Sequence, residues 1–268
     1  MKHDAYIFDV DGVLIDTSTS FSEAVVLAVE IATGSSQFQY EQIKELKEIP
    51  GFNNDWNVAI AGAAWISFME STPYADFLDS LNQKGGGMDS LIKIIPSLSD
   101  SFQHNITQLG MEAYGGTSAC KQLYGFEPET ILIEGTWKNE SVFIQANDLQ
   151  SFLPKSGIIT GRNETEMKLA FQILKWNLPT SRVAVSDNSQ FDKPNPSKLK
   201  KIINELKSKA PIYFGDSRDD YDLVKNFKNE TGIQIEFCCV GSQNGIQEFD
   251  YQVNNVMDYF KNMESNHG

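Results

Sequence analysis

Residues 5–14 read AYIFDVDGVL, and this stretch decides the fold. Its first half is apolar and rich in residues that favour strands, which predicts a buried β-strand over residues 5–10. Asp9 and Asp11 stand at the end of that strand and are followed by Gly12, which permits a tight turn. Side chains two positions apart on an extended chain share one side. The stretch therefore predicts that two carboxylates converge just beyond a buried strand.

The alternative is a plain turn or a fragment of a calcium-binding loop. An EF-hand would carry a Glu six residues after the glycine and would have helices on both sides. Ser18 occupies that position here, and a strand precedes the motif. The sequence therefore favours a functional pair of acids.

Other polar residues follow the apolar runs in the second half of the chain. Thr160 ends the run at 157–160, and Gly161 follows it. The Thr160 hydroxyl and the backbone N–H groups at this point can hold an anion. Lys193 follows the run at 182–186 and can neutralise a phosphate. Taken singly, these residues also fit an ordinary turn and a solvated surface lysine.

The run at 211–214 leads into GDSRDD, residues 215–220. Asp216 at this point suits Mg²⁺, a hard cation that takes oxygen ligands. Acids there also suit the first turn of a helix. Both interpretations can hold, with Asp216 on a metal and Asp222 merely exposed.

Strand-like and helix-like segments alternate through the second half of the chain, which is typical of a parallel sheet covered by helices. Strands are expected at 157–160, 182–186, 211–214 and 235–240, and helices at 165–176, 196–206, 219–227 and 255–263. Asn163, three residues before Glu166, predicts a capping box at the start of the first of these helices. The segment after the first strand differs, with helices expected at 19–33, 40–47, 57–70, 74–82 and 88–95. Short extended pieces are expected at 130–133 and 141–144, with a helix from about residue 147.

The sequence thus predicts an α/β fold, with a core at 1–16 and 150–268 and a mostly α-helical insertion at 17–149. Residues 100–145 are expected to form an extra subdomain or an extension of that insertion. The chain has 268 residues and a formal net charge of −14. That charge disfavours nucleic acid and anionic membrane surfaces as partners. No signal peptide, membrane span or disulfide framework is recognisable, so a cytoplasmic location is expected. The oligomeric state is not predicted.

The four motifs IFDVDGVL, IITGR, DKPNP and YFGDSRDD, in this order, resemble those of the haloacid dehalogenase (HAD) superfamily. The resemblance covers the α/β core, about half of the chain. The first and last motifs are the most specific. Residues 50–56, PGFNNDW, are similar to a subgroup whose helical cap lies between the first two motifs. The resemblance implies a Rossmann-like parallel core with a cap inserted after the first strand.

The resemblance also implies a role for each motif residue. Asp9 would be the nucleophile that forms an aspartyl phosphate, and Asp11 would be the general acid and base. Thr160 and the Gly161 N–H group would hold phosphate oxygens, and Lys193 would neutralise the nucleophile and the transferring group.

The cofactor implied by the resemblance is Mg²⁺. Its ligands would be the carboxylates of Asp9 and Asp216 and the backbone carbonyl of Asp11. The usual spacing selects Asp220 as the supporting acid, with Asp219 as the alternative.

An acid at Asp11 is what phosphoester chemistry needs, so the resemblance implies a Mg²⁺-dependent phosphomonoester hydrolase acting on a small phosphorylated metabolite. A sugar-phosphate mutase of the same fold is the alternative, and a non-catalytic binding protein is less favoured. Substrate choice is expected to lie with the insertion. Candidates there are Asn53, Asn54, Asp55, Trp56 and the loop at 115–118. Taken singly, Trp56 and Phe52 are expected to pack in the core of the insertion, and Asn54 is expected to cap a helix. Arg162 and Arg218 adjoin motifs, and a substrate contact and a surface role are both open for them.

Overall fold

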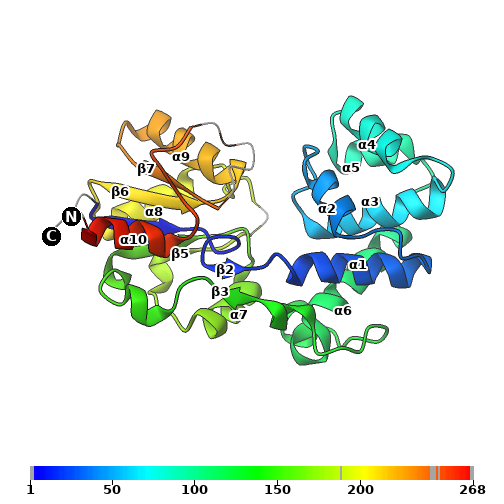
Figure 1. The fold of residues 1–268 in the computed structure, drawn as a ribbon, viewed down its shortest axis with the longest axis horizontal. Coiled ribbons are helices and arrows are strands. Elements are labelled where there is room, and N and C mark those ends of the chain that lie inside the picture. Colours follow the sequence, from blue (N-terminus) through cyan, green and yellow to red (C-terminus); the bar gives the residue numbers. More distant parts are fainter. Residues whose placement is uncertain (1–2, 188, 242–245, 247, 266–268) are drawn as a thin grey trace. The chain divides into compact units, whose positions relative to one another are not determined.

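The computed structural model describes residues 3–187, 189–241, 246 and 248–265, and it comprises two compact units (Figure 1). Unit 1 contains Met1–Thr17 and Ser141–Gly268, and unit 2 contains Ser18–Glu140. Unit 1 contains a parallel sheet with helices, and unit 2 is mostly helical. Residues 141–149, which the sequence places with the insertion, lie in unit 1.

Unit 1 holds a six-stranded parallel sheet in the order β5-β4-β1-β6-β7-β8. Its strands are β1 (Ala5–Phe8), β4 (Ser156–Ile159), β5 (Val183–Ala184), β6 (Pro211–Gly215), β7 (Glu236–Val240) and β8 (Tyr251–Val253). The β1–β6 register pairs Ile7 with Tyr213 and Phe8 with Phe214. The fold predicted from the sequence is therefore confirmed.

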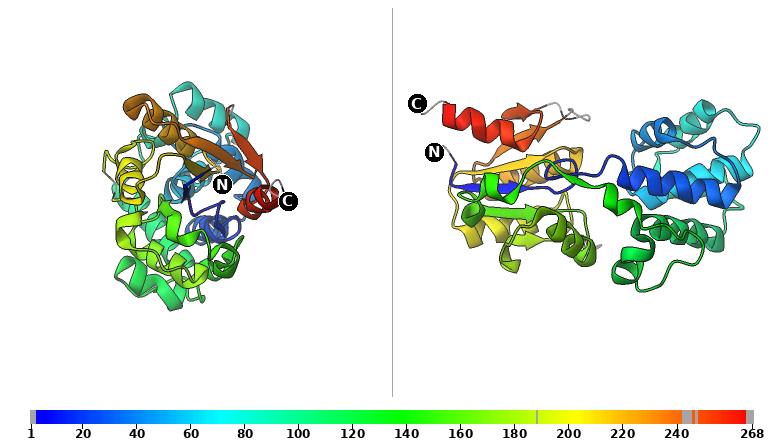
Figure 2. Two further views of the ribbon diagram at one scale, coloured as in Figure 1. Left: turned by 90° about the vertical axis from the view of Figure 1, so that its left-hand side faces the viewer. Right: turned by 60° about the horizontal axis from the view of Figure 1, so that its bottom comes forward.

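Side chains alternate between the two faces of this sheet, as a strand requires. Phe8 and Phe214 pack on one face with apolar residues of α7 (Glu164–Leu174) and α10 (Val256–Ser265). Ile7 and Tyr213 point to the other face, against α8 (Ser197–Leu206) and α9 (Arg218–Thr231). Figure 2 gives two further views of these helices around the sheet. Both faces are covered, which is why the strands read as continuous apolar runs.

A two-stranded antiparallel sheet follows the first motif. β2 (Ile15–Asp16) pairs with β3 (Ser141–Val142), so that Asp16 is the register partner of Ser141. Ile144 and Leu149 then pack into the core of unit 1. This pairing and burial explain why 141–149 belongs with unit 1. Short 3-10 turns at Ala146–Leu149, Leu153–Lys155 and Thr180–Arg182 complete the connections.

Unit 2 is built from helices α1 (Ser20–Thr33), α2 (Tyr40–Lys47), α3 (Asp55–Phe68), α4 (Tyr74–Gln83), α5 (Gly87–Ile94) and α6 (Asp100–Tyr124), with a 3-10 turn at Thr136–Asn139. Helices α1, α3 and α6 pack against one another. A core of buried residues that includes Val25, Phe38, Phe52 and Phe77 holds the unit together. None of the described helices is long and apolar enough to span a bilayer.

Three elements, α6, β2 and β8, were not predicted, and the helix expected from about residue 147 is limited to the 3-10 turns at Ala146–Leu149 and Leu153–Lys155. α6 was missed because it carries Gly110, Gly115 and Gly116, which read as helix breakers. At Gly110 the helix approaches Trp56 so closely that a Cβ atom would lie 2.6 Å from its ring, and Gly116 kinks the helix at φ +55°. The edge strand β8 was also missed. Residues 130–133 form no strand, because Thr130 and Ile131 donate their N–H groups to the Glu112 side chain instead.

Candidate active site

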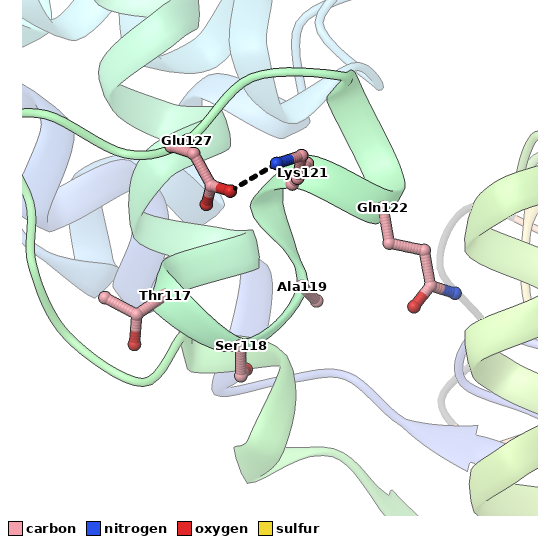
Figure 3. A pocket seen from close by; sticks show the side chains of 6 residues that line it. All are labelled: Thr117, Ser118, Ala119, Lys121, Gln122 and Glu127. Atoms are coloured by element: carbon pink, nitrogen blue, oxygen red, sulfur yellow. Dashed lines mark hydrogen bonds and ion pairs between the residues drawn. The ribbon is translucent and has the colours of Figure 1, made fainter.

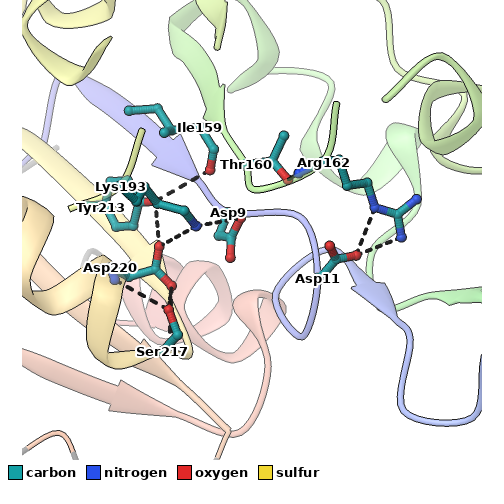
Figure 4. Close-up of polar contacts among 9 residues, drawn as sticks. All are labelled: Asp9, Asp11, Ile159, Thr160, Arg162, Lys193, Tyr213, Ser217 and Asp220. Atoms are coloured by element: carbon teal, nitrogen blue, oxygen red, sulfur yellow. Dashed lines mark hydrogen bonds and ion pairs between the residues drawn. The ribbon is translucent and has the colours of Figure 1, made fainter. Parts of the chain in front are cut away.

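The motif residues of unit 1 meet at the carboxyl ends of four neighbouring parallel strands (Figure 4). Asp9 follows β1, Thr160 follows β4 and Asp216 follows β6, while the loop after β5 leads to Lys193. The Asp9 N–H group donates to the Phe214 carbonyl at 2.9 Å, which continues the β1–β6 ladder to the motif. Open α/β sheets bind their ligands at this edge.

Lys193 is the cation of the cluster, and its side chain is 12% exposed. Its Nζ lies 3.1 Å from Oδ1 of Asp9 and 2.8 Å from Oδ1 of Asp220. Burial works to lower the pKa of Lys193, but the carboxylates of Asp220 and Asp9 outweigh it and raise that pKa above its usual value. Lys193 therefore stays charged beside Asp9.

Asp220 is fully buried, and both oxygens of its carboxylate accept hydrogen bonds from other residues of unit 1. Oδ1 accepts the Lys193 ammonium and the Tyr213 hydroxyl, each at 2.8 Å. Oδ2 accepts the Ser217 hydroxyl at 2.6 Å and the Ser217 N–H group at 3.2 Å, in a capping box at the start of α9. With four donors on its two oxygens, the Asp220 carboxylate is placed to fix Lys193.

Three carboxylates form the acidic part of the site. Oxygen atoms of Asp9, Asp216 and Asp220 all lie within 4.8 Å of one another. Burial raises the pKa of Asp9 well above its usual value; the Lys193 charge opposes this, and Asp220 and Asp216 add to it. Burial and the Asp220 charge raise the pKa of Asp216 to about 7. Crowded oxygen donors of this kind fit a hard divalent cation, which would relieve their repulsion.

The turn after β1 brings Asp11 to the opposite side of Asp9 from Lys193 (Figure 4). Leu14 and Ile15 donate their N–H groups to the Val10 carbonyl at 2.8 and 2.9 Å, which closes the turn. Asp11 is half-buried, and its Oδ1 accepts the Arg162 side chain from Nε at 2.9 Å and Nη2 at 2.6 Å.

Thr160 is buried, and its N–H group donates to the Ala184 carbonyl at 3.0 Å. Its Oγ1 accepts the Arg162 N–H group at 3.1 Å. The following Gly161 is open, since a Cβ atom there would meet nothing within 4 Å. Helix α7 begins close behind, capped by Asn163 as the sequence predicts, so this segment offers room and N–H groups to an anion.

Three residues that support this cluster, Tyr213, Ser217 and Lys198, were not singled out from the sequence. Tyr213 and Ser217 hold Asp220, as described above. Lys198, in the first turn of α8, donates to the Val185 carbonyl at 2.7 Å and pairs with Asp192, the residue before Lys193. The capping-box spacing of Ser217 and Asp220 is a sequence signal for that contact. The Lys198 network depends on how the loop folds and has no such signal.

The insertion candidates have structural partners within unit 2. Asn54 caps α3 by accepting the N–H groups of Trp56 and Asn57, and Phe52 is buried. Trp56 packs edge-on against Phe21 and Tyr114. Capping and packing are therefore confirmed for Asn54, Phe52 and Trp56.

A hollow of about 340 Å³ lies beside the kink of α6, lined by Thr117, Ser118, Ala119, Lys121, Gln122 and Glu127 (Figure 3). The hydroxyls of Thr117 and Ser118 donate to the carbonyls of Ile133 and Glu134. Lys121 is paired with Glu127 at 2.8 Å. The loop at 115–118 thus holds the segment that follows α6.

No protein-family model matches the chain, and no curated protein sequence matches it. Several solved structures do match the chain. A phosphatase from Thermococcus thioreducens matches with a TM-score of 0.71 and 24% identity, over 90% of this chain and 94% of that one. A predicted phosphoglycolate phosphatase from Haemophilus somnus matches with a TM-score of 0.59 and 11% identity, over 98% and 99% of the two chains.

A HAD-superfamily hydrolase of subfamily IA from Geobacter sulfurreducens matches with a TM-score of 0.53 and 13% identity, over 97% of this chain and 95% of that one. The chain therefore has the fold of HAD-superfamily hydrolases, as the resemblance of its motifs implies.

Proposed function

We propose, with this fold as the premise, that the protein is a Mg²⁺-dependent phosphomonoester hydrolase that acts on a small phosphorylated metabolite through an aspartyl phosphate. The observation that carries the proposal is the contact of Lys193 with Asp9. A buried carboxylate 3.1 Å from a largely shielded ammonium, at the carboxyl end of the central strands, has the chemistry of an activated nucleophile. Two structural neighbours, a phosphatase and a HAD-superfamily hydrolase, agree with this assignment.

Mg²⁺ would be held by the carboxylates of Asp9 and Asp216 and by the backbone carbonyl of Asp11. When bound, it supplies positive charge that lets a phosphate dianion approach the nucleophile and that stabilises the transition state. The supporting acid is Asp220, as the motif spacing selects. With four donors on its oxygens, its part is to hold Lys193 rather than to bind the metal directly.

In the first step Asp9 attacks phosphorus, and the bond from phosphorus to the ester oxygen breaks. Asp11, in its protonated form, gives its proton to that oxygen, so the alcohol leaves neutral. Thr160, the Gly161 N–H group and Lys193 hold the phosphoryl oxygens in line. The Lys193 charge also opposes the burial that raises the pKa of Asp9.

In the second step a water molecule attacks the phosphorus of the aspartyl phosphate. Asp11, now a carboxylate, takes the proton from that water. The bond from phosphorus to the Asp9 oxygen breaks, and inorganic phosphate leaves. One ester and one water are consumed, one alcohol and one phosphate are formed, and both aspartates return to their starting states.

The experiment is release of phosphate from an aryl phosphate, with Mg²⁺ and with a chelator, by the wild type and by Asp9→Asn. Metal-dependent turnover that is lost in the variant is the expected result. The matched control is Asp222→Asn, the same exchange at an acid paired with Arg218 at 3.0 Å on the surface, which keeps the wild-type rate. Turnover that survives in Asp9→Asn, or that needs no metal, would overturn the proposal.

The same preparation is then given hexose phosphates, and the products are analysed. Free phosphate is expected. Isomerised sugar phosphate without free phosphate would assign a mutase instead, since a mutase shares the core residues and differs in protecting the aspartyl phosphate from water. The cytoplasmic location expected from the sequence stays a prediction.

A further inference from the structure

Arg162 stands out among the residues around the site because of its connections. Its side chain is 1% exposed, and its guanidinium places two N–H groups on one oxygen of Asp11, a residue 151 positions away in the chain. A buried, planar guanidinium with two bonds to the same carboxyl fixes that carboxyl more firmly than a single contact does.

The backbone N–H group and the backbone carbonyl of Arg162 are both hydrogen-bonded as well. Its N–H group donates to Thr160 Oγ1 at 3.1 Å, and its carbonyl accepts the Ser186 N–H group at 2.8 Å. The Ser186 hydroxyl in turn donates to Asp192 at 2.7 Å, next to Lys193. Arg162 is thus joined to the motif of Asp11, to the motif of Thr160 and to the loop that carries Lys193.

We propose that Arg162 is a positioning residue for proton transfer, which holds the carboxyl of Asp11 in the orientation that serves the leaving oxygen of the ester. The inference rests on the proposed function and deepens it. Arg162 exchanges no proton itself and acts through Asp11. The proton passes from Asp11 to the ester oxygen as the bond to phosphorus breaks.

This role has a signature that a merely structural role lacks. A poor leaving group, such as the alkoxide of an alkyl phosphate, needs a proton as it departs. A good leaving group, such as dinitrophenolate, departs without one. General acid catalysis contributes about 10²–10⁴-fold where it is needed. Loss of Arg162 should therefore slow alkyl phosphates more than activated aryl phosphates, whereas a general loss of folded protein slows both equally.

The test compares kcat/KM for an alkyl phosphate and for 2,4-dinitrophenyl phosphate in the wild type, Arg162→Met, Arg162→Lys and Asp11→Asn. In Arg162→Met the ratio of the aryl value to the alkyl value is expected to rise about 10-fold or more. Arg162→Lys, which keeps a cation but not the planar pair of donors, is expected to fall between Arg162→Met and the wild type. Arg162→Lys carries the test alone if Arg162→Met does not fold.

Two comparisons make the result specific. In an Asp11→Asn background, adding Arg162→Met should change the ratio no further, because the residue that Arg162 positions is already gone. The matched control is Arg182→Met, which removes an arginine that donates to the Pro154 carbonyl at 2.6 Å, and it should leave the ratio at the wild-type value.

An equal loss on both esters in Arg162→Met, or a further change of the ratio in the double variant, would overturn the inference and leave the proposed function standing. A folded wild type that hydrolyses neither ester would overturn the proposed function, and the inference would fall with it.

Discussion

Gly12 lies directly against Asp216, such that a Cβ atom on residue 12 would stand 2.0 Å from the Oδ2 atom of that acid. The backbone at Gly12 has φ +72°, a region that L side chains rarely adopt. Glycine therefore allows the turn after β1 to touch the acid after β6. The two halves of the proposed metal site meet through this contact.

Gly12→Ala is expected to lower Mg²⁺-dependent phosphatase activity by about 10²-fold, because the new methyl group displaces the Asp216 carboxylate. The control is Gly232→Ala, which has φ +70° but open space around it. It carries the same backbone strain of about 1–2 kcal/mol and should keep its activity. Activity assays and thermal unfolding of both variants check the prediction. Equal activity in the two would contradict it.

Asp216→Asn and Asp220→Asn are expected to fail in different ways. Asp216→Asn removes a proposed ligand, so the Mg²⁺ concentration for half-maximal activity should rise about 10-fold or more. Asp220→Asn removes the partner of Lys193, so kcat at saturating Mg²⁺ should fall while the Mg²⁺ requirement changes little. Mg²⁺ titrations of activity separate the two effects. A large shift of the Mg²⁺ requirement in Asp220→Asn would instead make Asp220 a direct ligand.

The metal-free protein is expected to lose stability as the pH rises from about 4 to about 7. The pKa of Asp216 is raised to about 7 by burial and by Asp220, and that of Asp9 is also raised. In that range the folded chain binds more protons than the unfolded chain, so its free energy of unfolding decreases with pH.

Mg²⁺ should compensate for this loss, because it binds the ionised carboxylates. At about 100 times its Kd it adds about 2.7 kcal/mol, which corresponds to a rise in Tm of about 5–10 °C. That rise should be larger at about pH 7.5 than at about pH 5. Thermal scans with and without Mg²⁺ at both values measure it, and a rise independent of pH would argue against a site made of these acids.

Lys198→Met is expected to lower kcat/KM by about 10–100-fold, since Lys198 fixes the loop that ends at Lys193. Lys200→Met is the matched control on the same helix, because Lys200 pairs with Glu230 on the surface. It should leave kcat/KM unchanged. Steady-state assays on the aryl phosphate, with Tm as a check on folding, decide the matter. A fall in Tm without any fall in kcat/KM would limit Lys198 to a structural role.

Glu112→Gln is expected to destabilise unit 2 by about 1–3 kcal/mol. Glu112 is fully buried and accepts the N–H groups of Thr130 and Ile131 at 2.8 and 2.9 Å. Glu127→Gln, at an exposed pair with Lys121, is the control and should cost about 0–1 kcal/mol. Urea unfolding of both variants gives the comparison.

The effect of Glu112→Gln should also depend on pH. Burial alone would raise the pKa of Glu112, but the N–H groups of Ile131 and Thr130 lower it below its usual value. The stabilisation is therefore present at neutral pH and is lost as the pH falls through that lowered pKa. The difference between Glu112→Gln and the wild type should shrink in acid, and a constant difference would contradict the assignment.

Strands β1, β4 and β6 could be predicted from the sequence because each of them carries two signals. An apolar run marks the strand, and a polar residue such as Asp9 or Asp216 marks its end. Since parallel strands end at one edge, these residues come together without knowledge of the packing. The capping box that starts at Asn163 was predicted for the same local reason.

What could not be predicted depends on contacts between distant residues. In α6, Gly110 leaves room for the Trp56 ring, and Gly116 leaves room for the backbone of Gly135. In the sequence Arg162 comes directly after Thr160 and Gly161, a position that fits either a substrate contact or a surface residue. Its contact with Asp11 forms only when the turn after β1 folds. The loop that Lys198 contacts has no regular secondary structure, so no sequence periodicity predicts these hydrogen bonds.

The pairing of Asp16 with Ser141 has a consequence for how this chain can evolve. The polypeptide leaves unit 1 and returns to it at the paired strands β2 and β3. The segment from Ser18 to Glu140 is thus an insertion whose two ends lie side by side in the structure. It can be lengthened, shortened or exchanged through junctions at these two ends alone, while every strand of the parallel sheet keeps its neighbour.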